Sequence, residues 1–75
     1  MQYDDDCENI KATVRELAPD FSDIDCRRDF ETKGYIVTLR WKFRSHVMRF
    51  SEEQVDDRLL PPAAEAAIAR IKRGE

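Results

Sequence analysis

The sequence has few of the residues that cross-link small folds. It contains two cysteines, two glycines and three prolines among 75 residues. Cys7 and Cys26 are too sparse for the dense disulfide framework of a small secreted domain, and no CxxC pair indicates a zinc or thioredoxin-type site. We expect both thiols to be free and to face the core, where a thiol behaves as a small hydrophobic group. A redox role for the pair stays open.

Long apolar runs are also missing. No stretch approaches the roughly 20 residues that a membrane-spanning helix needs. The first three residues lead directly into three aspartates, whereas a secretory signal begins with basic residues and continues with apolar ones. These absences predict a cytoplasmic protein with no membrane partner.

The length and composition predict a single domain that comprises residues 1–75. Hydrophobic residues make up 41% of the chain and charged residues 39%, and a disordered segment would be poorer in aromatic and branched aliphatic residues. A chain this short buries only about 60% of its unfolded surface. A homodimer would enlarge so thin a core, so monomer and homodimer are both open.

Acidic residues are missing from one segment. Residues 33–50 contain five bases and no acid, whereas residues 1–32 carry a net charge of −6 and residues 51–75 a net charge of −2. This segregation is the most unusual feature of the sequence, and it directs attention to the basic segment as a binding surface.

The N-terminal part has the periodicity of an amphipathic helix over residues 4–18. Its apolar face recurs at spacings of three and four and comprises Tyr3, Cys7, Ile10, Val14 and Leu17. Asp4, Asp5 and Asp6 suit the cap and the positive end of the helix dipole. Pro19 ends the helix, and we expect Phe21 to pack against the core.

Residues 24–31 alternate as a strand that directs Ile24, Cys26, Arg28 and Phe30 to one side. Lys33 and Gly34 then form a predicted turn. The next strand alternates most clearly. Its predicted core side comprises Tyr35, Val37, Leu39, Trp41 and Phe43, and its opposite side comprises Ile36, Thr38, Arg40, Lys42 and Arg44.

A second turn is predicted at residues 44–46. Met48 and Phe50 then continue the Trp41 side, and Val47 and Arg49 face the other way. Two tight turns predict an antiparallel meander of three strands.

The C-terminal part predicts two helical segments. Ser51 and Gln54 form a capping box before a short helix over residues 52–60 that presents Val55 and Leu59. Pro61 and Pro62 interrupt it. A second helix over residues 63–73 then buries a face of small and branched residues, and Gly74 ends it; that face comprises Ala64, Ala67, Ile68 and Ile71.

These elements predict an α+β fold, a two-layer sandwich of α-β-β-β-α order whose two helices pack on one face of the sheet. The order resembles that of double-stranded-RNA-binding domains. Those domains carry a lysine-rich stretch at the start of the last helix, where this chain has Pro61, Pro62, Ala63 and Ala64. The resemblance is therefore one of element order and implies no function.

The exposed face of the predicted sheet is the candidate binding surface. It carries five cations that could hold phosphates: Arg27, Arg40, Lys42, Arg44 and Arg49. Ordinary solvated positions are the competing interpretation, because Asp25, Asp29 and Glu31 could neutralise them across strands. Single-strand binders also interleave aromatic residues with cations, and the aromatic residues of the second strand are all predicted to face the core.

Catalytic and metal sites are not indicated. Consecutive aspartates at the start of a helix diverge, so Asp4, Asp5 and Asp6 suit capping better than metal binding. Ser45-His46 resembles the Ser-His segment of small toxin ribonucleases, but those carry a preceding glycine where this chain has Arg44. We expect no enzyme activity, no cofactor and no metal. The favoured hypothesis is a non-enzymatic binding or regulatory domain that uses its exposed sheet face, with an unidentified protein partner, or self-associates; the alternative is a nucleic-acid-associated module.

Overall fold

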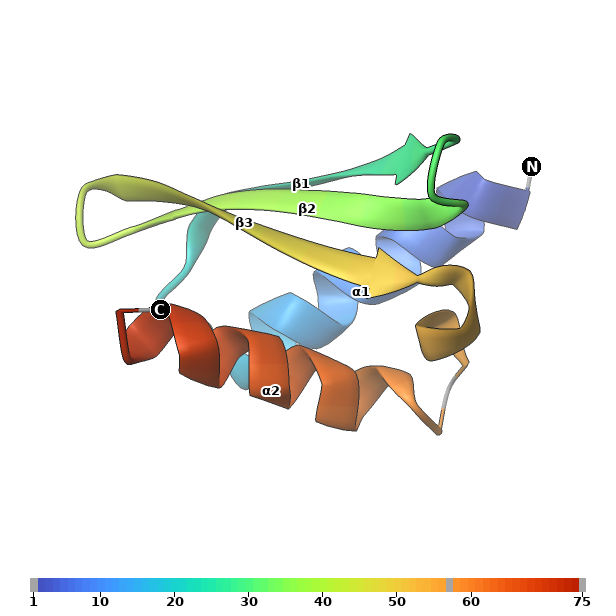
Figure 1. Ribbon diagram of the computed structural model, residues 1–75. Coiled ribbons are helices and arrows are strands. Elements are labelled where there is room, and N and C mark those ends of the chain that lie inside the picture. The colour runs from blue at the N-terminus through green and yellow to red at the C-terminus, as the bar shows by residue number, and fades with distance from the viewer. Residues whose placement is uncertain (1, 57, 75) are drawn as a thin grey trace.

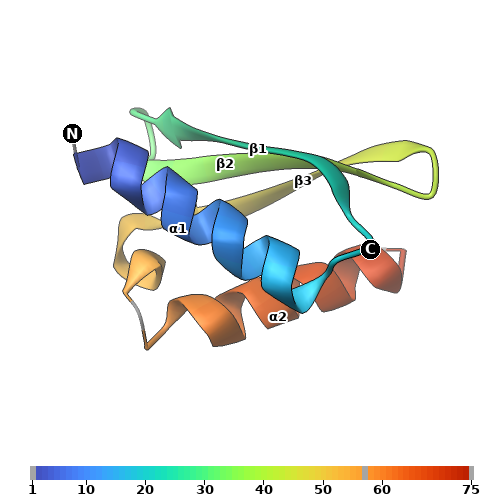
Figure 2. The same cartoon turned by 180° about the vertical axis from the view of Figure 1, so that it is seen from behind.

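The computed structural model describes residues 2–56 and 58–74, with side chains from Asp5 onward. The predicted core position of Tyr3 and the cap role of Asp4 lie outside the described side chains. The chain forms, in order, α1 (Gln2–Leu17), β1 (Ser22–Asp29), β2 (Gly34–Trp41), β3 (Arg44–Ser51), the 3-10 turn η1 (Glu52–Val55) and α2 (Leu60–Lys72). Both helices cover the same face of the sheet (Figures 1 and 2). The predicted two-layer α+β fold is confirmed.

The sheet is an antiparallel meander in the order β1-β2-β3. Val37 lies between Cys26 and Met48 on the face toward the helices, here called the inner face. Ile36 lies between Arg27 and Arg49 on the opposite, outer face. Among the described residues, no helix covers the outer face (Figures 1 and 2).

The core lies between the inner face and the two helices. The buried apolar residues come from every layer: Ile10, Val14, Ala18, Phe21, Tyr35, Val37, Leu39, Met48, Phe50, Leu60, Ala64, Ile68 and Ile71. The prediction for Leu17 is wrong, because this side chain is 37% exposed. Ala18 and Phe21 fill the core at this end of α1, and a hydrogen bond from the Phe21 N–H to the Ala18 carbonyl fixes the chain between them.

The first hairpin turn differs from its prediction. It comprises residues 30–33, and Gly34 is already the first residue of β2. Lys33, not the glycine, takes the left-handed conformation, with φ 58°. Glycine is required at position 34 for a steric reason, because a Cβ there would lie 2.5 Å from the Phe50 carbonyl oxygen. Phe30 is 71% exposed instead of facing the core, because the strand ends at Asp29.

The second hairpin turn also differs from its prediction. Lys42 and Phe43 form it, so Trp41 pairs with Arg44, and Arg44 shares the inner-face side with Trp41 rather than the outer face with Arg40. A two-residue turn at 44–45 or 45–46 would shift the β2–β3 pairing by four or six residues and leave Tyr35 without a β3 partner. The observed turn pairs all eight residues of β2, from Gly34 with Ser51 to Trp41 with Arg44.

This register imposes strain on the turn. Lys42 and Phe43 both have positive φ, 52° and 65°, as a two-residue hairpin turn of the I′ type requires. Asparagine and glycine are the residues that tolerate these angles, and other residues lose roughly 1–2 kcal/mol there. Burial of the Phe43 side chain does not offset this strain, because the side chain is 98% exposed.

The segment after β3 is less helical than predicted. Only Glu52–Val55 forms a 3-10 turn, which begins where the Ser51 N–H donates to the Gln54 side-chain oxygen (2.8 Å). Leu59 is 52% exposed. α2 begins earlier than predicted, at Leu60, so that both prolines lie in its first turn, where their missing N–H groups leave no helical hydrogen bond unmade. Gly74 ends α2 with φ 84°, as predicted.

The strain at Phe43 leads to a stability prediction. Replacement of Phe43 by glycine should raise the free energy of unfolding by about 1 kcal/mol, because the left-handed conformation is no longer penalised and no buried area is lost. Urea denaturation measures the change. Phe30→Gly in the other hairpin turn is the matched control and should lower stability. A destabilised Phe43→Gly chain would contradict the assigned turn.

Candidate functional site

The five cations predicted to share the outer face are divided by the structure. Arg27 and Arg49 flank Ile36 on that face. Arg40 lies on the same face, opposite Ser45, but four residues along β2 from Ile36, which is about 13 Å. Lys42 lies in the turn, and Arg44 is on the inner-face side. The outer face is therefore a sparse surface rather than a continuous basic stripe.

The structure instead gathers cations at the end of the β2–β3 hairpin, which projects past the C-terminal end of α2 (Figures 1 and 2). We call this group the hairpin-end cluster; it comprises Arg40, Lys42, Phe43, Arg44, Lys72 and Arg73. Phe43, Lys72 and Arg73 were missing from the sequence-predicted site. A two-residue turn placed inside the alternating pattern would have exposed Phe43, and the two cations that end the last helix were visible as a charge pair.

Trp41 joins the two sides of the cluster. Lys42 Nζ lies 4.7 Å from the centre of the Trp41 ring, and Lys72 Nζ lies 5.9 Å from it. Ammonium groups at these distances are attracted to the indole face. The Trp41 ring also contacts Phe21 and His46, each with a ring-centre distance of 6.1 Å. Trp41 is therefore a half-buried platform held from several directions.

Asp20 fixes this platform. The Trp41 Nε1–H donates to Asp20 (2.9 Å), and the Lys72 ammonium donates to the same carboxylate (3.3 Å). Partial burial would raise the pKa of the Asp20 carboxyl, but the hydrogen bonds from Lys72 and Trp41 outweigh it and lower the pKa below its ordinary value. The carboxylate is thus ionised at neutral pH, and it connects the α1–β1 connection, the end of β2 and the end of α2.

Two hollows share Trp41 and Lys42 in their walls. One, of about 320 Å³, is also lined by Arg44, His46, Lys72 and Arg73. The other, of about 420 Å³, is also lined by Asp20, Asp23, Arg40 and Phe43. Ile71 and Gly74 complete the wall of the first hollow. This wall combines cations with aromatic rings, so it suits an anionic group next to a flat ring.

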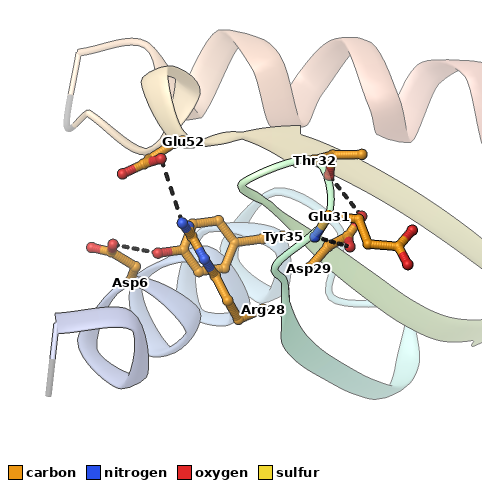
Figure 3. Close-up of polar contacts among 7 residues, drawn as sticks. All are labelled: Asp6, Arg28, Asp29, Glu31, Thr32, Tyr35 and Glu52. Atoms are coloured by element: carbon orange, nitrogen blue, oxygen red, sulfur yellow. Dashed lines mark hydrogen bonds and ion pairs between the residues drawn. The ribbon is translucent and has the colours of Figure 1, made fainter.

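A second polar cluster lies at the opposite end of β2 (Figure 3). The Tyr35 hydroxyl donates to Asp6 of α1 (2.6 Å), and the Arg28 guanidinium donates to Glu52 of η1 (3.4 Å). Arg28 also lies over the Tyr35 ring, 5.0 Å from its centre. Each charged group here faces an opposite charge or a hydroxyl. The cluster therefore ties α1, β1, β2 and η1 together, and its polar groups are engaged with one another.

The turn beside this cluster, residues 30–33, is stabilised by hydrogen bonds to Asp29. Asp29 accepts hydrogen bonds from the Thr32 hydroxyl (2.6 Å) and the Glu31 N–H (3.2 Å) (Figure 3). The Thr32 hydrogen bond is the main reason that the pKa of Asp29 is lowered. Asp29 therefore shapes the residue 30–33 turn, and its carboxylate has a weaker electrostatic interaction with Arg49 of the outer face.

The sequence also raised the questions of a metal site, a catalytic His46 and a membrane span. Over the described residues, no three His, Cys, Asp or Glu side chains form a group that could hold a metal ion. His46 lies on the inner face opposite Leu39, and its Nε2 atom is buried without a hydrogen-bond partner. Within the described part of the chain, no helix is long and apolar enough to cross a membrane.

No protein-family model, curated protein or solved structure matches the chain significantly.

Tyr35 provides a pH-dependent test of the second cluster. Burial, with a further contribution from Asp6, raises the pKa of Tyr35 from 10 to about 12. A raised folded-state pKa contributes stability that is fully present below pH 10 and is lost as pH rises toward 12. Tyr35→Phe should lower the free energy of unfolding by about 1 kcal/mol at neutral pH. That difference should shrink as pH rises from 10 to 12.

Urea denaturation of both chains from pH 7 to pH 11.5 measures this difference. Other groups that titrate in this range are present in both chains and cancel. A difference that stays constant over the whole range would show that Tyr35 does not titrate as the structure predicts.

Proposed function

We propose that this chain is a non-enzymatic binding domain and that single-stranded nucleic acid binds to its hairpin-end cluster. One observation carries the proposal. Phe43 is 98% exposed and has a strained positive φ, at a position flanked by Lys42 and Arg44. The folded chain would be more stable with glycine or asparagine at this position. A bulky aromatic residue that stability does not favour indicates a ligand that uses its ring.

The chemistry of the cluster matches unpaired nucleotides. An exposed aromatic ring stacks on any unstacked base, and this contact is tolerant of sequence. The guanidinium groups of Arg40 and Arg44 suit phosphate oxygens, to which they can donate two hydrogen bonds at once. Lys72 and Arg73 extend the positive charge from the turn toward α2. A strand that stacks on Phe43 could therefore have cations on both sides.

The exposed Phe43 also removes the main objection to nucleic-acid binding that the sequence raised, the lack of aromatic residues among the cations. That argument assumed that the aromatic residues of β2 all face the core, and the turn at Lys42 and Phe43 makes the assumption wrong for Phe43. A protein partner on the outer face stays a prediction. Ile36 and the half-exposed Val47 offer some apolar area there, but Arg27, Arg49 and Asp25 surround it with mixed charge.

A membrane surface is the other polyanion that an aromatic residue among cations could meet. Burial of one phenylalanine side chain contributes only about 1.5–3 kcal/mol, and stable membrane attachment takes more than one such anchor. Base stacking needs only one ring. The single exposed aromatic residue at this tip therefore favours nucleic acid over lipid.

The proposal predicts binding to a short fluorescently labelled oligonucleotide of mixed sequence, measured by anisotropy. With three or four phosphate contacts, affinity should fall roughly 20- to 50-fold between about 50 and about 200 mM salt. Phe43→Ala should weaken binding about 5- to 150-fold, because base–aromatic stacking contributes roughly 1–3 kcal/mol. Quenching of Trp41, the only tryptophan, should report the same event.

Two matched variants serve as controls. Phe30→Ala removes the exposed aromatic residue of the other hairpin turn, and Arg27→Gln removes an outer-face cation; both should bind like the wild-type chain. Equal losses from Phe30→Ala and Phe43→Ala would contradict the assigned site. Binding to phosphatidylserine vesicles without binding to oligonucleotide would replace the proposal with a membrane function, and binding to neither would refute it.

A further inference from the structure

Cys7 and Cys26 lie where α1 packs on β1. Cys7 belongs to the same helical face as the buried residues Ile10 and Val14. Cys26 lies on the inner face of β1, where it pairs with Val37 of β2. Both side chains are half-buried and pack against the core. Two thiols from elements separated in sequence therefore occupy one interface.

The two thiols are also close enough to interact. Burial raises the pKa of the Cys26 thiol, and the neighbouring Cys7 thiol raises it further. Both thiols are free. A disulfide requires that the two Cβ atoms approach to about 4 Å, and both side chains already pack into the interface between α1 and β1 where this bond would lie.

We propose that Cys7 and Cys26 are a reversible disulfide site that staples α1 to β1. The oxidant is a small-molecule disulfide such as oxidised glutathione. The Cys7 thiolate attacks one sulfur of this disulfide, whose S–S bond breaks and releases one small thiol. The Cys26 thiolate then attacks the Cys7 sulfur and displaces the second small thiol. The protons of the two protein thiols end on the two released thiols.

The order of the steps follows from the surroundings of Cys26. A thiol whose ionisation is disfavoured is a poor first nucleophile, so Cys26 acts second, against a sulfur that is already held next to it. The closed loop would contain most of α1 and the connection that carries Asp20 and Phe21. The staple would therefore stabilise the segment from which Asp20 holds Trp41. This site is independent of the proposed nucleic-acid function.

The test uses the intact folded chain in buffers of defined oxidised and reduced glutathione. After alkylation of free thiols, intact mass spectrometry should detect a species that has lost two hydrogens. A non-reducing digest should link the Cys7 and Cys26 peptides. The equilibrium constant for this disulfide should be at least tenfold larger in native buffer than in urea, because the fold holds the thiols together. The oxidised chain should melt about 10 °C higher than the reduced chain.

Cys7→Ser and Cys26→Ser are the matched variants. Cys26→Ser should accumulate one glutathione adduct on Cys7 in place of the internal disulfide, and Cys7→Ser should form its adduct on Cys26 at least tenfold more slowly. A native chain that carries two adducts or forms intermolecular dimers would overturn the proposal. So would an equilibrium constant no larger than that in urea, or a lower melting temperature after oxidation. These readouts on the wild-type chain do not depend on whether either variant folds.

Discussion

The two-residue turn at Lys42 and Phe43 is the constraint on which the rest of the structure depends. It is inseparable from the β2–β3 register, in which Val37 pairs with Met48 and Tyr35 with Phe50 on the inner face. These buried pairs form the sheet side of the core. The same turn forces two non-glycine residues to positive φ and leaves Phe43 in solvent. Core packing and the exposed aromatic tip are thus two consequences of one register.

The polar clusters at the two ends of β2 differ in charge, and this difference distinguishes the structural cluster from the proposed binding site. At the Tyr35 end, Asp6 accepts a hydrogen bond from the Tyr35 hydroxyl, and Glu52 accepts one from Arg28 (Figure 3). At the Trp41 end, Asp20 accepts hydrogen bonds from both the indole and Lys72, while Lys42 and Arg44 add positive charge along the same hollow. Positive charge in excess of its internal partners is what an anionic ligand requires.

The hydrophobic periodicity was sufficient to predict the element order, the meander and nearly all of the core, because burial depends on spacings of two and of three or four. The turns were harder to predict. Lys42-Phe43 has none of the asparagine or glycine that marks a two-residue turn, and full pairing of β2 decided its position against local preference. The candidate site depended on that turn, so Phe43 and Arg44 were assigned to the wrong faces, and the contribution of α2 required the tertiary fold.

Residue-resolved NMR titration of the isotopically labelled chain with a short single-stranded oligonucleotide at low salt tests the central claim most directly. The account predicts shifts that cluster at residues 40–44 and 71–74, with the largest change at the Phe43 ring, and that fade as salt is added. Shifts centred on Arg27, Ile36 and Arg49 would assign binding to the outer face instead. The absence of shifts at low salt would contradict a nucleic-acid function of the hairpin end.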